Sequence, residues 1–176
     1  MAFDCFLSIE GIQGECSDEA HRNAIELVGY NHSVTHTAGL TRGPSGGFDS
    51  VADHKDFVIT KSVDQTTPQL AAACSQGTRY NSAKVEVARA TGDKATYWEI
   101  EMKDVYIRSV AFNAAQDGDL PTETVALAYS KIVWTYYLFD HKTGRSRGTN
   151  QTSADLTQGS PDPSQWAASS NCSARM

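Results

Sequence analysis

The chain has 176 residues, of which 40% are hydrophobic and 20% are charged, the balance of an ordinary soluble globular protein. Its formal net charge of -6 argues against nucleic acid as a partner, because phosphate backbones select basic surfaces. No apolar run approaches the ~18 residues that a membrane span needs, and Asp4 and Glu10 interrupt the start where a signal peptide would be basic and then apolar. We expect a cytosolic chain without membrane insertion, unless a signal-independent machine exports it.

Alternation of apolar and polar residues dominates the chain and predicts strands. In chain order, the expected strands are FDCFLSI, AIELVGYNHSVTH, DFVITKSV, KVEVAR, YWEIEMKDVYIRSVAF and TVALAYSKIVWTYYLF. The last segment carries β-branched and aromatic residues on both faces, which predicts one long strand that is buried on each side. About six or seven strands follow from this pattern, so the fold class is mainly β.

One short helix is expected in TTPQLAAACSQG. Thr67 is the predicted N-cap, Pro68 the first helical residue and Gly77 the C-terminal stop. Leu70 and Cys74, four residues apart, would give the helix one apolar stripe. The expected architecture is a barrel or sandwich of strands with this helix beside it.

The glycine-rich stretch TRGPSGGFDSVADHKDF, from Thr41 to Phe57, interrupts the alternation. It is not a phosphate-binding loop, because it contains neither a Gly-Lys pair nor a G-x-G-x-x-G motif. It could be a flexible linker or an arm that docks on another surface, and the pattern alone leaves both open.

The residues that could carry chemistry form no catalytic or metal-binding pattern. His32 and His36 are four apart in strand-like sequence, which separates them by roughly 13 Å, so we interpret them as polar surface or barrel-mouth histidines. Glu99 and Glu101 share a strand face, which is typical of a solvated face with alternating charges. The four cysteines lack metal-binding spacing and are expected to be free thiols: Cys5, Cys16, Cys74 and Cys172. We expect no enzyme, cofactor or metal, and the pattern favours a binding or assembly module.

The segment 141–176 is rich in Gly, Ser, Thr, Asn and Pro, and Trp166 is the only Phe, Tyr or Trp in it. Such a composition buries too little apolar surface to offset its ordering entropy, so we expect much of it to be mobile. The predicted organisation is a β domain over residues 1–140 and a partly flexible extension over residues 141–176.

Several separated blocks resemble the haemolysin-coregulated protein (Hcp) family, the tube proteins of bacterial type VI secretion. The first is MAFDCFLSIEGIQGEC, in which Cys16 stands where the family usually has Ser, and the second is DFVITKSVDQTTPQL, from Asp56 to Leu70. The third is the C-x-x-G from Cys74 to Gly77. The fourth is a late strand with these matching positions: Val125, Leu127, Tyr129, Lys131, Ile132, Trp134 and Tyr136. The resemblance covers about residues 1–140.

The resemblance implies an antiparallel β-barrel with one short flanking helix and an extended Gly-rich loop. It further implies a homohexameric ring, rings that stack into a tube, and small effector proteins inside the lumen. A contractile sheath would drive the tube, tipped by a spike protein, from the bacterial cytoplasm out of the cell, which requires no signal peptide. A ligand-binding β-barrel that does not polymerise is the alternative.

Two surfaces are predicted to serve such an assembly. The arm would make contacts between subunits or between rings, with Phe48 as its apolar anchor; its contact residues are Thr41, Arg42, Gly43, Pro44, Ser45, Gly46, Gly47 and Phe48. A floppy loop is the alternative for this stretch. The strand from Ile25 to Val34 would line the lumen, where Asn31 and Ser33 lie on one face by parity and would meet cargo. Plain solvent exposure is the alternative for that strand.

Overall fold

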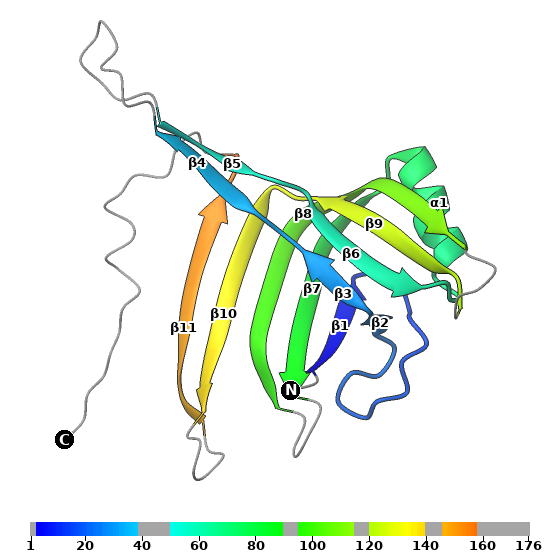
Figure 1. The fold of residues 1–176 in the computed structure, drawn as a ribbon, viewed down its shortest axis with the longest axis horizontal. Helices are drawn as coiled ribbons and strands as arrows, with labels where there is room; N and C mark the ends of the chain where they lie inside the picture. Colours follow the sequence, from blue (N-terminus) through cyan, green and yellow to red (C-terminus); the bar gives the residue numbers. More distant parts are fainter. Residues whose placement is uncertain (1–2, 39–49, 90–94, 115–119, 140–145, 158–176) are drawn as a thin grey trace, which may run out of the picture.

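The computed structural model describes residues 3–38, 50–89, 95–114, 120–139 and 146–157, and these form a mainly antiparallel β structure with one short helix (Figure 1). The predicted fold class is therefore confirmed. The elements, in chain order, are β1 (Phe3–Ile9), β2 (Ile25–Leu27), β3 (Gly29–Asn31), β4 (Val34–Ala38), β5 (Ser50–His54), β6 (Phe57–Ser62), α1 (Thr67–Gln76), β7 (Arg79–Arg89), β8 (Thr96–Asn113), β9 (Thr122–Ala128), β10 (Lys131–Phe139) and β11 (Ser146–Asp155).

The main sheet has the strand order β2-β1-β7-β8-β9-β6-β3, and β10 and β11 branch from β8. Its two end strands, β2 and β3, are consecutive in the chain and are separated only by Val28. β2 pairs with β1, whereas β3 pairs with β6, and the Val28 N–H donates to the Thr60 carbonyl oxygen at 2.8 Å. The sheet therefore curls back until its two ends are joined through this one segment. The predicted single strand over AIELVGYNHSVTH is wrong, because the segment is divided among β2, β3 and β4.

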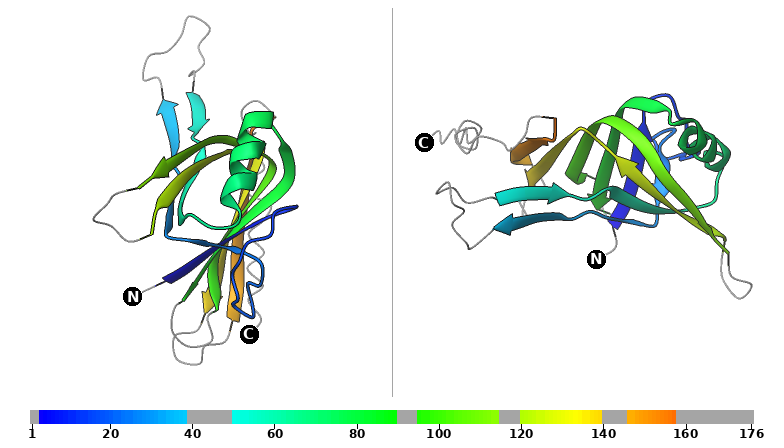
Figure 2. Two further views of the ribbon diagram at one scale, coloured as in Figure 1. Left: turned by 90° about the vertical axis from the view of Figure 1, so that its right-hand side faces the viewer. Right: turned by 90° about the horizontal axis from the view of Figure 1, so that it is seen from above.

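The core lies inside this curl and is built from alternate residues of the paired strands. Cross-strand neighbours from β1, β7 and β8, such as Leu7, Val85 and Ile100, are almost completely buried. The helix α1 lies at one end of the molecule (Figure 2) and contributes Leu70 and Ala73 to the same core. Burying such apolar side chains is the main source of stability for the fold.

The long strand β8 pairs with two different strands along one of its edges. This explains why the prediction of one long strand over TVALAYSKIVWTYYLF is wrong. Its first half pairs with β10 and its second half with β9. Asp104, with φ 52, lies between the two halves, and Ser130 lies between β9 and β10. The Ser130 N–H donates to the Lys103 carbonyl at 3.0 Å, and its hydroxyl donates to Asp104 Oδ2 at 2.6 Å. TVALAYSKIVWTYYLF is thus two strands that part at Ser130. In β9 each buried residue alternates with a partly exposed one, so only one face is buried.

The predicted helix is present, but its N-cap is Thr66 rather than Thr67. The Thr66 hydroxyl donates to Asp64 Oδ1 at 2.6 Å and makes no hydrogen bond to the helix. Thr67 is instead the first helical residue, and its hydroxyl reaches into the sheet. Gly77 ends the helix in the left-handed conformation with φ 65, as predicted from the preference for glycine at this position.

Strand β11 extends the sheet beyond residue 140, into the segment that the composition predicted to be mobile in large part. It pairs with β10 from Lys131↔Asp155 to Phe139↔Ser146. Its sequence, SRGTNQTSAD, lacks apolar alternation, so the pattern could not reveal it. Trp166 lies outside the described residues. Among the residues that are described, no helix is long and apolar enough to cross a membrane.

Candidate functional site: the projecting arm and its base

Strands β4 and β5 form a separate two-stranded antiparallel ribbon that projects from the body, at the end opposite α1 (Figure 1). The pair Val34↔His54 lies at the base of the ribbon, and Ala38↔Ser50 at its far end. The side chains of Val34, Thr35 and His36 are exposed, although in a strand they alternate between the two faces. The predicted contact residues Thr41 to Phe48 follow β4 and precede β5 in the sequence and lie outside the described residues.

A ribbon of two strands with both faces exposed has little apolar surface to stabilise it. Isolated hairpins are marginally stable in water, and a third strand or a packed face is usually needed. At the base of the ribbon the Lys55 N–H donates to the Ser33 carbonyl oxygen at 3.1 Å, which continues the pairing of β4 with β5 but adds no third strand. The arm is therefore built as a surface that another molecule could cover.

Aromatic and imidazole rings connect the base of the arm to the main sheet. His32, which joins β3 to β4, lies with its ring 5.5 Å from Phe57 and 6.2 Å from Trp134. His54, the last residue of β5, stacks on the same Trp134 at 6.2 Å. His32 Nε2 lies 2.7 Å from the Tyr129 hydroxyl, which donates at 3.3 Å to the Lys55 carbonyl. We call these five residues the base cluster: His32, His54, Phe57, Tyr129 and Trp134.

Burial sets the protonation behaviour of the base cluster. It lowers the pKa of His32, and the neighbouring His54 lowers it further. Burial also lowers the pKa of His54, against the opposing effect of Asp53. Burial, together with the charge of Asp56, raises the pKa of Tyr129 to about 12. Both histidines and the phenol are therefore neutral near pH 7.

The predicted lumen residues Asn31 and Ser33 are both exposed, on either side of the inward-turned His32. Asn31 ends β3, where it lies opposite Val58. Ser33 falls outside a strand, in the link to β4. Their exposure agrees with the sequence, and the surface that they face in an assembly stays a prediction.

Glu99 and Glu101 lie on the polar face of the main sheet. Glu101 pairs with Lys103, and Glu99 accepts a hydrogen bond from the Tyr137 hydroxyl at 3.3 Å. Lys84 and Glu86 form a further ion pair of 3.0 Å on the same face. These contacts agree with a face of alternating charges and give neither glutamate the environment of a catalytic acid.

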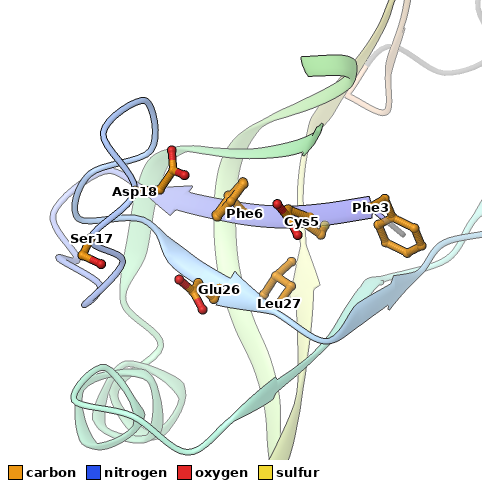
Figure 3. A pocket seen from close by; sticks show the side chains of 8 residues that line it. Phe3, Cys5, Phe6, Ser17, Asp18, Glu26 and Leu27 are labelled. Atoms are coloured by element: carbon orange, nitrogen blue, oxygen red, sulfur yellow. The ribbon is translucent and has the colours of Figure 1, made fainter. Parts of the chain in front are cut away.

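A cleft of about 380 Å³ lies beside β1 and β2 (Figure 3). Its carboxylates come from Asp4, Asp18 and Glu26, and Asp18 Oδ1 already accepts the Ala20 N–H at 3.1 Å. Burial raises the pKa of the Cys5 thiol in this cleft to about 12, so the thiol is a poor nucleophile. Within the described ranges, no group of three or more His, Cys, Asp or Glu residues could hold a metal ion.

Sequence reasoning missed the base cluster and the buried ion pair between Lys61 and Glu123. His32 and Tyr129 are 97 residues apart, and no local spacing could connect them. Lys61, in contrast, carried a readable signal. In DFVITKSV it has the same parity as Phe57 and Ile59, so the alternation that buries those two also buries Lys61.

The comparisons with known proteins agree with this structure. The family model described as "Type VI secretion system effector, Hcp" matches residues 6–136. Protein hcp1 of Pseudomonas aeruginosa is 31% identical over 137 residues, which are 77% of this chain and 84% of that protein. The Major exported protein of the same organism is 30% identical over 132 residues, 70% of this chain and 74% of that protein.

Solved structures show the same fold. A structure titled as a type six secretion system protein has a TM-score of 0.81 at 26% identity, and the match covers 90% of this chain and 99% of that one. Hcp1 from Salmonella typhimurium has a TM-score of 0.74 at 25% identity and covers 90% of this chain and 98% of its own. With its β fold, its projecting arm and these matches, the chain belongs to the Hcp family of type VI secretion proteins.

Proposed function

We propose that this chain is the tube subunit of a type VI secretion system: six copies close a ring, and rings stack into a tube. The observation that carries the proposal is the exposed β4–β5 arm in a member of the Hcp family. A projecting ribbon that seats on a different surface of the next copy makes a heterologous contact, and such contacts close rings. Residues Thr41 to Phe48 would make these contacts between subunits or rings.

The remaining partners follow from the same proposal. Small effector proteins would occupy the lumen, and Asn31 and Ser33, which are exposed, are our candidates for the wall that meets them. The spike protein would bind the end of the tube, and the contractile sheath would surround it. The subunit would assemble in the bacterial cytoplasm and leave the cell with the tube, which agrees with a relative named as a major exported protein. Its role would be structural rather than enzymatic.

Deletion of residues 43–47 tests the role of the arm in this function. The described residues of the arm base, and hence the fold, are left in place. We expect the deletion to abolish tubes in negative-stain electron microscopy, and to reduce ring mass if the arm also joins subunits. A matched control is Pro44→Ser, which makes residues 43–47 all Gly or Ser and keeps the length of the segment. Unchanged rings and tubes in the deletion variant would contradict the proposal.

A further inference from the structure

Two histidines at the base of the arm lie close to the same side chain of the main sheet, the indole of Trp134. His32 lies at the start of the arm and His54 at the end of it, and both rings lie 6.2 Å from that of Trp134. In the chain they stand where the ribbon leaves and rejoins the main sheet, His32 between β3 and β4 and His54 at the end of β5. A change in the charge of either imidazole would therefore act at the base of the arm.

Protonation would be unfavourable at both positions. His54 Nδ1 is buried and has no hydrogen-bond partner among the described residues. In the charged imidazole both nitrogens carry a proton, so Nδ1 would become a buried donor without an acceptor. His32 is half-buried among Phe57, Tyr129 and Trp134, and a charge there would lose part of its hydration.

The charged groups around the base cluster offset the cost of protonating His32 or His54 only in part. Asp53 is next to His54 but is paired with Lys55 at 2.6 Å. Asp56, next to Phe57, is paired with Arg108 of β8 at 3.1 Å. Tyr129 and Trp134, on the β9–β10 side, offer a neutral hydroxyl and an aromatic face. Burial is the largest influence on both rings and lowers the pKa of each histidine, in His54 against the opposing charge of Asp53.

We propose that His32 and His54 form an acid-sensitive latch, in which neutral imidazoles seat the arm on Trp134 and Tyr129 and protonation of either one releases it. A histidine whose pKa is lowered in the seated state has an ordinary pKa near 6.5 when the arm is released. Its full contribution to the stability of the seated state is therefore present above pH 6.5. This stabilisation is lost as the pH falls through that value toward the lowered one. If the arm joins copies, which rests on the proposed function, acid would also loosen the tube.

Hydrogen exchange of the arm at two pH values tests the latch, whatever the oligomeric state. Between about pH 7.5 and about pH 5.5, and after correction for the intrinsic rate, we expect the opening equilibrium of β4 and β5 amides to rise, by up to about tenfold for each histidine. Amides of β1 and β7 should keep their protection. The double variant His32→Gln/His54→Phe should abolish the arm response. His36→Gln, which changes an exposed histidine of the same ribbon, should leave it intact.

Equal arm protection of the wild-type protein at both pH values would overturn the latch, as would a double variant that responds like the wild type. Loss of protection in β1 and β7 together with the arm would also overturn it, because the acid effect would then be global. Should the double variant fail to fold, titration of the imidazole protons by NMR in the wild-type protein decides. The latch requires midpoints for His32 and His54 below the ordinary histidine value of 6.5, and midpoints at or above that value refute the latch. A monomeric protein that keeps the response would contradict the proposed function and leave the latch intact.

Discussion

Lys61 Nζ lies 2.8 Å from Glu123 Oε1, and both side chains are completely buried between β6 and β9. Asp64 accepts from the same ammonium group at 2.7 Å, and the Thr67 hydroxyl donates to Glu123 Oε1 at 3.1 Å. One lysine thereby ties together two strands and the start of α1. These contacts join the start of α1 to β6 and β9, and Leu70 and Ala73 pack the helix on the core.

We predict that Lys61→Met lowers the free energy of unfolding by about 3–5 kcal/mol, because it leaves the Glu123 and Asp64 carboxylates near each other without a cation. Urea denaturation measures the loss. The double variant Lys61→Met/Glu123→Leu removes both buried charges and should recover most of the stability. Lys84→Met is the matched control at a surface ion pair and should cost at most about 1 kcal/mol. If Lys61→Met were as stable as Lys84→Met, the buried ion pair would not contribute to stability as proposed.

The same cluster predicts sensitivity to acid. Burial alone would raise the pKa of Asp64, but hydrogen bonds from Lys61 and Thr66 outweigh it and hold the pKa below its ordinary value of 3.8. A lowered carboxyl pKa gives stability that is present above 3.8 and is lost as the pH falls below it. We expect Asp64→Asn to flatten the stability curve in this range, as measured by urea midpoints. A curve parallel to that of the wild type would argue against this role of Asp64.

We predict that any side chain at position 14 would clash with the backbone. A Cβ at this position would lie 2.1 Å from the Ala24 carbonyl oxygen, which is backbone and cannot turn away. Gly14→Ala should therefore cost about 1–3 kcal/mol in thermal or chemical denaturation. Gly29→Ala, where a Cβ would meet nothing within 4 Å, is the matched control and should be close to neutral. Equal stability of the two variants would show that the loop before β2 adapts freely.

The described cysteines should differ in reactivity. Cys5 and Cys16 are buried and burial raises the pKa of each thiol, whereas Cys74 is partly exposed on α1. We expect iodoacetamide to label Cys74 in the native protein and to label Cys5 and Cys16 only after unfolding. Peptide mapping by mass spectrometry separates the three sites. Rapid native labelling of Cys5 would contradict the burial of β1.

Trp134 is expected to serve the arm more than the core. Its side chain is half-buried, so Trp134→Ala should cost less than the ~3–5 kcal/mol of a fully buried tryptophan, and the loss should be concentrated in the β4–β5 amides. Hydrogen exchange distinguishes this from a global effect. Leu7→Ala, at a fully buried core position, is the comparison, and it should lower the protection of the whole sheet. The same exchange profile for both variants would refute the local role of Trp134.

Sequence patterns predicted the elements whose signals are local. The alternation in FDCFLSI identified β1 to the residue, and Pro68 and Gly77 marked α1 correctly to within one residue at its N-cap. The break between β9 and β10 was missed because Tyr129 and Ser130 carry no turn signal. That break depends on Asp104 in a different strand. Strand β11 was missed because β10 supplies its pairing.

The candidate site was predicted only in outline. The glycine-rich composition located an arm, but the structure describes its stem and not its predicted contact residues. His32 was interpreted as a surface or barrel-mouth residue, whereas it lies half-buried against side chains from β6 and β10 and from the link between β9 and β10. Such a cluster arises when the sheet curls, and no spacing along the chain encodes it.

The solution mass of the tag-free protein, measured by light scattering across a range of concentrations, tests the central claim most directly. Each chain has a mass of 19.1 kDa, so a six-membered ring should give 6 × 19.1, or about 115 kDa. That mass would support the ring and make the arm an element of assembly. A single species of 19.1 kDa at every concentration would contradict the tube subunit and favour a ligand-binding barrel that does not polymerise.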